Sequence, residues 1–224
     1  VVGCFSFPIE EGLEGYFLIT AHLLMSRGYM LPLTLRYLAL SESVPVAGMM
    51  RAILHELCDE FHREMPLLDT AQQMGVYEFR EELFVTSFTY PERTYDCVKR
   101  VALRWIDEHT ANQLEAAGLK QRVNQLLALD EAFAPHTGAT REVIAHFDFD
   151  ANAVMDTLEG MELPAPALFT AQPTEVGIDV PGGVGDIIKD PDGGVWIHAE
   201  RSSSKAEHAA KLQPVTVQAL VASA

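Results

Sequence analysis

The sequence of 224 residues predicts a mainly α fold, in which a bundle-like helical region over residues 6–133 precedes a small α+β segment with a strand and a β-hairpin. Two observations indicate this fold. Apolar side chains recur every three to four positions through the first two-thirds of the chain, a spacing typical of amphipathic helices. After Pro135 the apolar period changes to two, and short β-prone runs alternate with glycine and proline. We therefore expect a helical domain at 1–133, a strand and hairpin segment at 134–200, and a polar, low-complexity tail at 201–224.

The first three helices have recognisable ends. Ser6 is suited to cap a first helix, which we expect to stop at Gly28. A shorter helix is predicted over residues 33–40. The next begins near Pro45 and ends before Pro66. Its apolar residues form one stripe at helical spacing: Met49, Ile53, Leu57 and Phe61.

The next part of the chain is less regular. Residues 78–88, EFREELFVTSF, fit either a helix or a short buried strand. Thr89 and Glu92 have the spacing of a capping box, which predicts a new helix starting between them. We expect that helix to continue to Gly118, and a last amphipathic helix to follow over residues 119–133.

Beyond Pro135, a half-buried strand is predicted at residues 143–150, because apolar residues alternate there with exposed ones. Asp150 or Asn152 then caps a short helix toward Gly160. The turn sequence DPDGG at residues 190–194 lies between two β-prone runs and predicts a hairpin. The inward positions of the strand are Val143, Ala145, Phe147 and Phe149.

Composition restricts the partners. Acidic residues outnumber basic ones 32 to 16, and the formal charge of −16 disfavours nucleic acid and anionic membrane surfaces. The cysteines Cys4, Cys58 and Cys97 include no C-x-x-C pair, which indicates a reducing, cytoplasmic location. The longest apolar stretch, residues 16–25, is about half of a membrane span. Since the chain starts with Val1, we expect it to be processed or to be a piece of a longer protein.

One helix carries four metal-ligand residue types. His55, Cys58, Asp59 and His62 are spaced at i, i+3, i+4 and i+7, so one side of a helix presents all of them. However, the sequence lacks H-E-x-x-H, and the span of about 10 Å is long for a single ion. We therefore predict no metal site, and keep a metalloenzyme using His55, Asp59 and His62 as an alternative.

A basic flank stands out in this acidic chain. Arg93, Arg100 and Arg104 lie on one predicted helix. They could steer an anionic ligand or dock onto an acidic neighbour, but i,i+4 ion pairs are the commoner outcome. We expect such pairs between Asp96 and Arg100 and between Arg104 and Glu108.

For three other polar residues we expect no role in catalysis or metal binding. Asp148 and Asp150 share one strand face and could form an acid pair, but we expect them to be solvated. His22, within an apolar helix, is expected to be a core histidine. We find no G-x-S-x-G elbow and assign no catalytic residue.

Three stretches carry a resemblance to a known family: VVGCFSFPIEEGLEGYFLITAHLLMSRGYMLPLTLRYLAL, SVPVAGMMRAILHEL and QLLALDEAFAPHTGATREVIAHFDFD. They resemble the C-terminal region of cobalamin-binding-domain radical S-adenosylmethionine proteins, over residues 1–160. The cluster motif C-x-x-x-C-x-x-C is absent. The resemblance therefore implies a part that follows the catalytic barrel, covers its open end and shapes the pocket for a small-molecule or peptide substrate.

In that role, S-adenosylmethionine, the 4Fe-4S cluster and cobalamin would bind to a preceding part of the parent chain, where the reaction could be a methyl transfer. Residues of this chain that we expect to contact substrate are His22, Arg36 and Tyr37. The alternative, from another functional class, is a free-standing helical module that binds a small ligand or a partner helix in an apolar groove.

Overall fold

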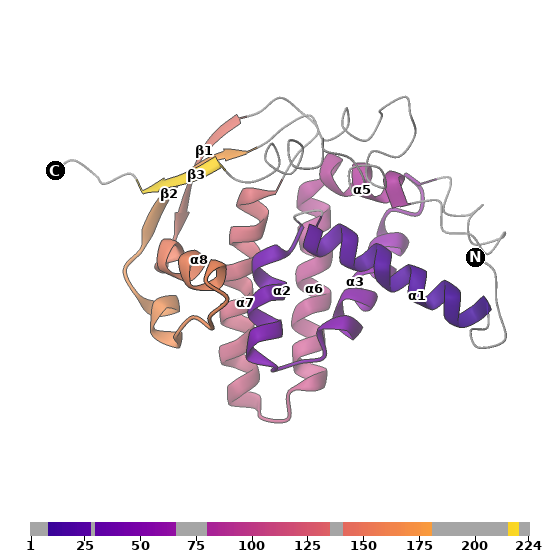
Figure 1. Cartoon of the computed structure of the whole chain (residues 1–224), viewed down its shortest axis with the longest axis horizontal. Coiled ribbons are helices and arrows are strands. Elements are labelled where there is room, and N and C mark those ends of the chain that lie inside the picture. Colours follow the sequence, from indigo (N-terminus) through magenta and orange to yellow (C-terminus); the bar gives the residue numbers. More distant parts are fainter. Residues whose placement is uncertain (1–8, 28–29, 66–79, 135–140, 181–214, 220–224) are drawn as a thin grey trace.

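The computed structural model describes residues 9–27, 30–65, 80–134, 141–180 and 215–219 (Figure 1). Within these residues the chain forms seven α-helices and one small antiparallel sheet. The predicted mainly α class, with a minor β component after the helices, is thus confirmed. No helix in this described part is both long and apolar enough to cross a membrane.

The first two helices lie where the sequence predicts them. Helix α1 spans Ile9–His22 and continues into a π-helical turn, η1, at Leu23–Arg27. Helix α2 spans Pro32–Ser41. The residue before α2, Leu31, has no side chain that caps the helix, so the first N–H groups of α2 need an acceptor from elsewhere. The predicted cap Ser6 lies outside the described residues.

Helix α3 spans Val46–Glu60 and confirms the predicted apolar stripe. The stripe faces the core, and α1 packs against this helix. Fully buried members of the stripe are Met49, Ile53, Leu57 and Phe61.

Helix α5 spans Arg80–Thr89, so the ambiguous segment is a helix, and α6 follows at Pro91–His109. The predicted capping box is wrong. Tyr90 occupies the N-cap position of α6, and the Thr89 hydroxyl donates a hydrogen bond to the Val85 carbonyl at 2.7 Å. Thr89 still belongs to the last turn of α5, where such an i−4 bond is the usual partner of a threonine hydroxyl.

Helix α7 spans Gln113–Phe133, which corrects the predicted helix boundary at Gly118. The break falls earlier, because the Asn112 side chain accepts a hydrogen bond from the Leu114 N–H at 2.9 Å and caps α7. Gly118 therefore lies inside a helix. The position of the helix boundary thus follows the Asn112 cap, and α7 accommodates Gly118 in its interior.

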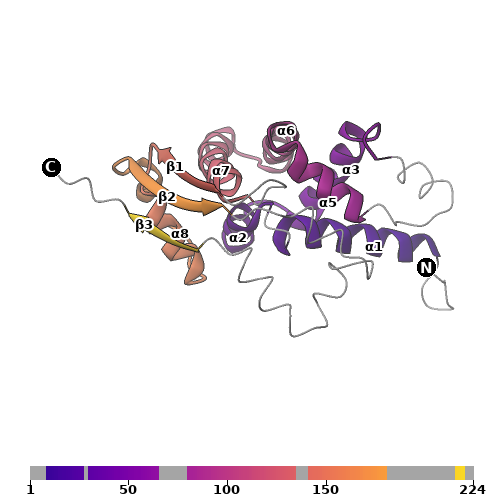
Figure 2. The same ribbon diagram turned by 90° about the horizontal axis from the view of Figure 1, so that it is seen from above.

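The helices form two rows (Figure 2). Helices α6 and α7 form a hairpin, with α3 beside α6, and together they make one row. Helices α1 and α2 make the other row, α1 against α3 and α2 against α7. The apolar core fills the space between the rows.

The sheet has the order β1-β2-β3, with antiparallel pairing throughout. Strand β1 spans Arg141–Phe147 and confirms the predicted strand, with Phe147 buried and Ile144 exposed. Strand β2 spans Thr174–Val180 and contacts α7, which places the sheet beside the helical part.

Strand β3 spans Val215–Ala219 and pairs with β2. It falls within the segment at 201–224 that we expected to be a polar tail, and that expectation is wrong for these five residues. The run VTVQA contains β-branched residues that suit a strand, but polar residues dominate the sequence before it. The hairpin predicted at 190–194 lies outside the described residues.

Helix α8 spans Ala151–Glu159 and confirms the predicted cap, because the Asp150 carboxylate accepts a hydrogen bond from the Ala153 N–H at 3.0 Å. A 3-10 turn, η2, follows at Pro166–Thr170 and contacts α8. Helix α8 also contacts α2, so it links the sheet segment to the helical rows.

Candidate functional site

His22, one of the three expected substrate-contact residues, is exposed at the end of α1. The expectation that it is a core histidine is wrong. The buried stripe runs through Phe17 and Ala21 of α1 and Leu24 of η1, and His22 lies on the adjoining side of the helix. Its ring is therefore accessible to solvent or to a ligand.

The other two candidates connect helices. Arg36 donates a hydrogen bond from Nη1 to the Leu158 carbonyl of α8 at 3.1 Å. The buried Tyr37 hydroxyl accepts one from Nε of Arg122 in α7 at 2.6 Å, and its ring meets Phe169 edge-on. Within the described part of the chain, no hydrogen bond or ring contact brings His22 to either residue. Arg36 and Tyr37 thus hold α2 against α7 and α8.

The three residues of the alternative metal site lie on α3 and in the turn that follows it. His55, Asp59 and His62 are exposed, whereas Cys58 is buried. The His55 ring lies 4.3 Å from the Phe17 ring of α1, centre to centre, and so packs as part of the α1–α3 contact. The described residues contain no group of three ligand side chains that could hold a metal ion.

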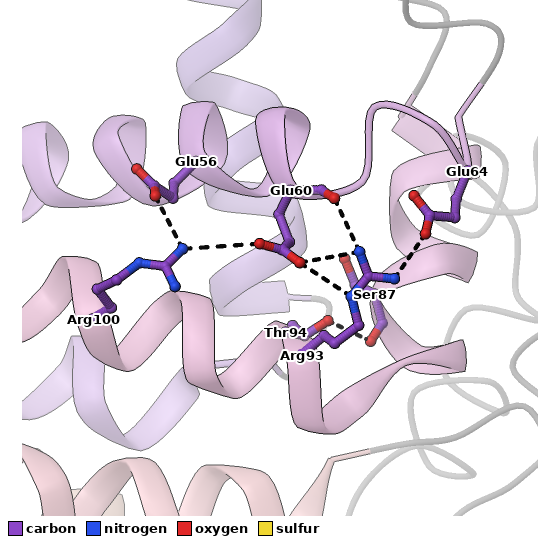
Figure 3. Close-up of polar contacts among 7 residues, drawn as sticks. All are labelled: Glu56, Glu60, Glu64, Ser87, Arg93, Thr94 and Arg100. Atoms are coloured by element: carbon purple, nitrogen blue, oxygen red, sulfur yellow. Dashed lines mark hydrogen bonds and ion pairs between the residues drawn. The ribbon is translucent and has the colours of Figure 1, made fainter.

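An ion-pair ladder joins α3 to α6 (Figure 3). Glu56, Glu60 and Glu64 are spaced four residues apart and face the arginines of α6. Arg93 lies 3.0 Å from Glu60 and 2.7 Å from Glu64, and Arg100 lies 3.0 Å from Glu56. We call these five residues the α3–α6 ladder.

The predicted pairs within α6 are confirmed only in part. Arg104 lies 4.0 Å from Glu108, as expected, and also 3.7 Å from Glu56. Arg100 pairs with Glu56 of α3 and not with Asp96. The spacing along one helix could predict the first pair, but not a partner on a helix more than 40 residues earlier.

Arg93 is the centre of the ladder. Its guanidinium lies over the Phe61 ring at 4.7 Å and near the Tyr90 ring at 5.5 Å. It also donates to the Glu60 carbonyl at 3.1 Å, at the negative end of α3. The hydrogen bond from Arg93 lowers the pKa of Glu64, and the same bond raises the pKa of Arg93. One side chain thus fixes the end of α3 to the start of α6.

A buried hydrogen bond fixes the neighbouring α5–α6 junction (Figure 3). The Thr94 hydroxyl donates to the Ser87 carbonyl at 2.8 Å. Both residues are buried, so this bond is shielded from water. It holds the last turn of α5 beside the first turn of α6.

The most unusual polar group of the helical part is Asp130 of α7, which is 1% exposed. Its carboxylate oxygens accept hydrogen bonds from the backbone N–H groups of Leu33, at 2.9 Å, and Thr34, at 3.0 Å. These groups belong to the first turn of α2, which lacks a cap of its own. Asp130 therefore caps α2 from a different helix.

Tyr95 of α6 completes this junction. Its buried hydroxyl donates to the Met30 carbonyl at 2.7 Å and lies 3.2 Å from the Asp130 carbonyl. Burial raises the pKa of Asp130 to about 7, although the hydrogen bonds from Leu33 and Thr34 oppose the shift. Burial, followed by the charge of Asp130, raises the pKa of Tyr95. We call Asp130, Tyr95 and the first turn of α2 the α2 cap.

We did not single out Asp130 from the sequence, although it carries a recognisable signal. It occupies a position on the apolar stripe of α7, in register with Val123, Leu126 and Phe133. A carboxylate at such a position is either buried with partners or incompatible with the stripe.

A second polar seam joins α7 to the sheet segment. Gln125 of α7 donates to Asp148 at 3.1 Å and to the Phe169 carbonyl at 3.1 Å. Asp148 is therefore held by a helix, and Asp150 caps α8. Each of the two carboxylates thus has its own structural partner, and Asp148 is exposed as expected.

The two described cysteines, Cys58 on α3 and Cys97 on α6, are buried, and burial raises the pKa of each thiol to about 12. Cys4 lies outside the described residues.

Comparison with known proteins gives no relative: no family model, no curated protein and no solved structure matches this chain. The class that the fold defines is a mainly helical protein whose buried polar groups connect its helices.

Proposed function

We propose that this chain is the accessory C-terminal region of a cobalamin-dependent radical S-adenosylmethionine enzyme, with no turnover of its own. It would act in the cytoplasm, covering the open end of the catalytic barrel of its parent chain and shaping the pocket for a small-molecule or peptide substrate. The cluster, S-adenosylmethionine and cobalamin would bind outside this chain. Nucleic acid is not a partner in this proposal, since the charge is −16.

The observation that supports this proposal is that polar side chains join one helix to another. Asp130 caps α2, Tyr37 and Arg122 join α2 to α7, and Arg93 joins α3 to α6. Contacts of this kind fix helices relative to one another and make a stiff wall. A radical reaction needs such a wall, because water and oxidants must be kept from its intermediates.

Two experiments test the proposal. The reading frame upstream of Val1 should encode a radical S-adenosylmethionine motif, C-x-x-x-C-x-x-C, in the same chain. A start codon close to Val1 with no such motif upstream would overturn it.

The second experiment uses this chain alone. Anaerobic reconstitution with iron and sulfide should give no charge-transfer absorption and no cleavage of S-adenosylmethionine. A stable cluster with S-adenosylmethionine cleavage would show that the chain carries the chemistry itself.

A further inference from the structure

We propose that the α2 cap is a proton-operated latch, in which ionised Asp130 holds the first turn of α2 on α7 and protonated Asp130 releases one of its two backbone N–H groups. This inference stands apart from the proposed function. It rests on the geometry of a buried carboxyl group that replaces the missing cap of α2.

The hydrogen bonds show why a proton would act as the switch. The ionised carboxylate has two acceptor oxygens, and each N–H of Leu33 and Thr34 points to a different one. A protonated carboxyl turns one oxygen into a donor, so only one N–H keeps a full acceptor. The bond to an ionised acceptor is also roughly twice as strong as that to a neutral one.

The buried surroundings of Asp130 bring its titration close to neutral pH. Burial raises the pKa of Asp130 to about 7, so both protonation states are populated close to physiological pH. No ion pair with a basic side chain holds Asp130 in its charged form within the described residues. The titratable groups next to the cap are Tyr95 of α6 and Glu131 of α7, and the charges of Glu92, Asp96 and Lys99 act on Glu131.

The consequence would reach beyond the cap, because α2 also carries two connecting residues. Arg36 bonds to Leu158 of α8, and Tyr37 bonds to Arg122 of α7. Both lie one turn after the capped residues. Loosening the first turn of α2 therefore weakens the support of the seam between the helical rows and α8.

The test is a pH titration of the backbone amides by NMR between pH 5 and 9, using the full chain. The amide signals of Leu33 and Thr34 should shift together with one midpoint near neutrality. Hydrogen exchange should show, on the acidic side, about tenfold less protection of one of these amides after correction for intrinsic exchange. A tenfold factor corresponds to about 1.4 kcal/mol, the scale of one hydrogen bond.

Two variants separate the latch from other titrations. Asp130→Asn has one acceptor oxygen at every pH, so the shift of both amides should disappear and one amide should stay weakly protected. The control Glu131→Gln changes the next carboxyl group and should keep the midpoint. Amides that do not shift in the wild type, or that shift equally in Asp130→Asn, would overturn the latch.

If Asp130→Asn fails to fold, the wild-type protein still decides the question. The side-chain carboxyl carbon of Asp130 reports its own protonation. A midpoint near 4 would overturn the latch, whereas a midpoint near neutrality that coincides with the amide shifts would support it.

Discussion

Gly48 of α3 is expected to be a position where alanine destabilises the fold, although it lies inside a helix. An added Cβ would lie 2.7 Å from Cζ2 and 2.9 Å from Cη2 of Trp105 in α6. The ring also stacks on His109 with ring centres 3.9 Å apart, so moving it away disturbs that contact. Gly48 therefore sets the close approach of α3 to α6.

Two opposing effects determine the magnitude. Alanine in a helix interior is favoured over glycine by about 1 kcal/mol. Forcing extra atoms into a packed contact costs about 1–3 kcal/mol. For Gly48→Ala we expect a net loss of about 1 kcal/mol in the free energy of unfolding.

Gly118→Ala provides the matched control. There the added Cβ would lie 3.3 Å from Nη1 of Arg122, which is the end of a long side chain. We expect this variant to gain about 0.5–1 kcal/mol from helix propensity. Urea unfolding of both variants, followed by circular dichroism, measures the difference.

A double-mutant cycle with Trp105→Phe identifies the cause, because phenylalanine lacks the two atoms that the new Cβ would meet. In the Trp105→Phe background, Gly48→Ala should become neutral or stabilising. The reasoning is refuted if Gly48→Ala stabilises the wild type as much as Gly118→Ala does, or if its penalty is the same in both backgrounds.

Three further predictions follow from the site. Because the pKa of Asp130 rises from 3.8 to about 7 on folding, the unfolded chain loses this proton first, and its contribution to stability falls by about 4 kcal/mol between pH 4 and 7; across this range the free energy of unfolding should fall more steeply for the wild type than for Asp130→Asn, and equal slopes would contradict the raised pKa. Arg93→Met should lower the free energy of unfolding in urea more than Arg51→Met does, because Arg51 makes an exposed pair with Glu14 whereas Arg93 pairs with two glutamates and lies over the Phe61 ring; equal losses would contradict a central role of Arg93. Cys58 and Cys97 should react with a thiol reagent at pH 8 only after denaturant is added, and rapid labelling of the native protein would contradict their burial.

Much of the fold could be predicted from sequence because it depends on local patterns. The stripe of α3, the alternation in β1 and the Asp150 cap of α8 each involve residues within one element. The wrong predictions lie where two nearby residues could each have set a helix boundary. Thr89 bonded back into α5 when it could have capped α6, and Asn112 began α7 before Gly118 could end the preceding helix.

The candidate site could not be predicted in the same way, because its contacts join distant parts of the chain. Asp130 and Leu33 are 97 residues apart, and Arg93 and Glu60 are 33 apart. A helical pattern indicates which side of α7 is buried, but not which helix covers it. The spacing rules therefore found Arg104–Glu108 and missed the α3–α6 ladder.

The α2 cap nevertheless suggests how such contacts could be recognised. Helix α2 starts after Leu31, which offers no capping side chain, and α7 carries Asp130 on its apolar stripe. Each feature is unfavourable by itself: the first leaves N–H groups without acceptors, and the second buries a carboxylate without donors. Placed together they satisfy each other, and the positive end of α2 favours the ionised carboxylate. A helix without a cap and a carboxylate on an apolar stripe are thus two halves of one long-range contact.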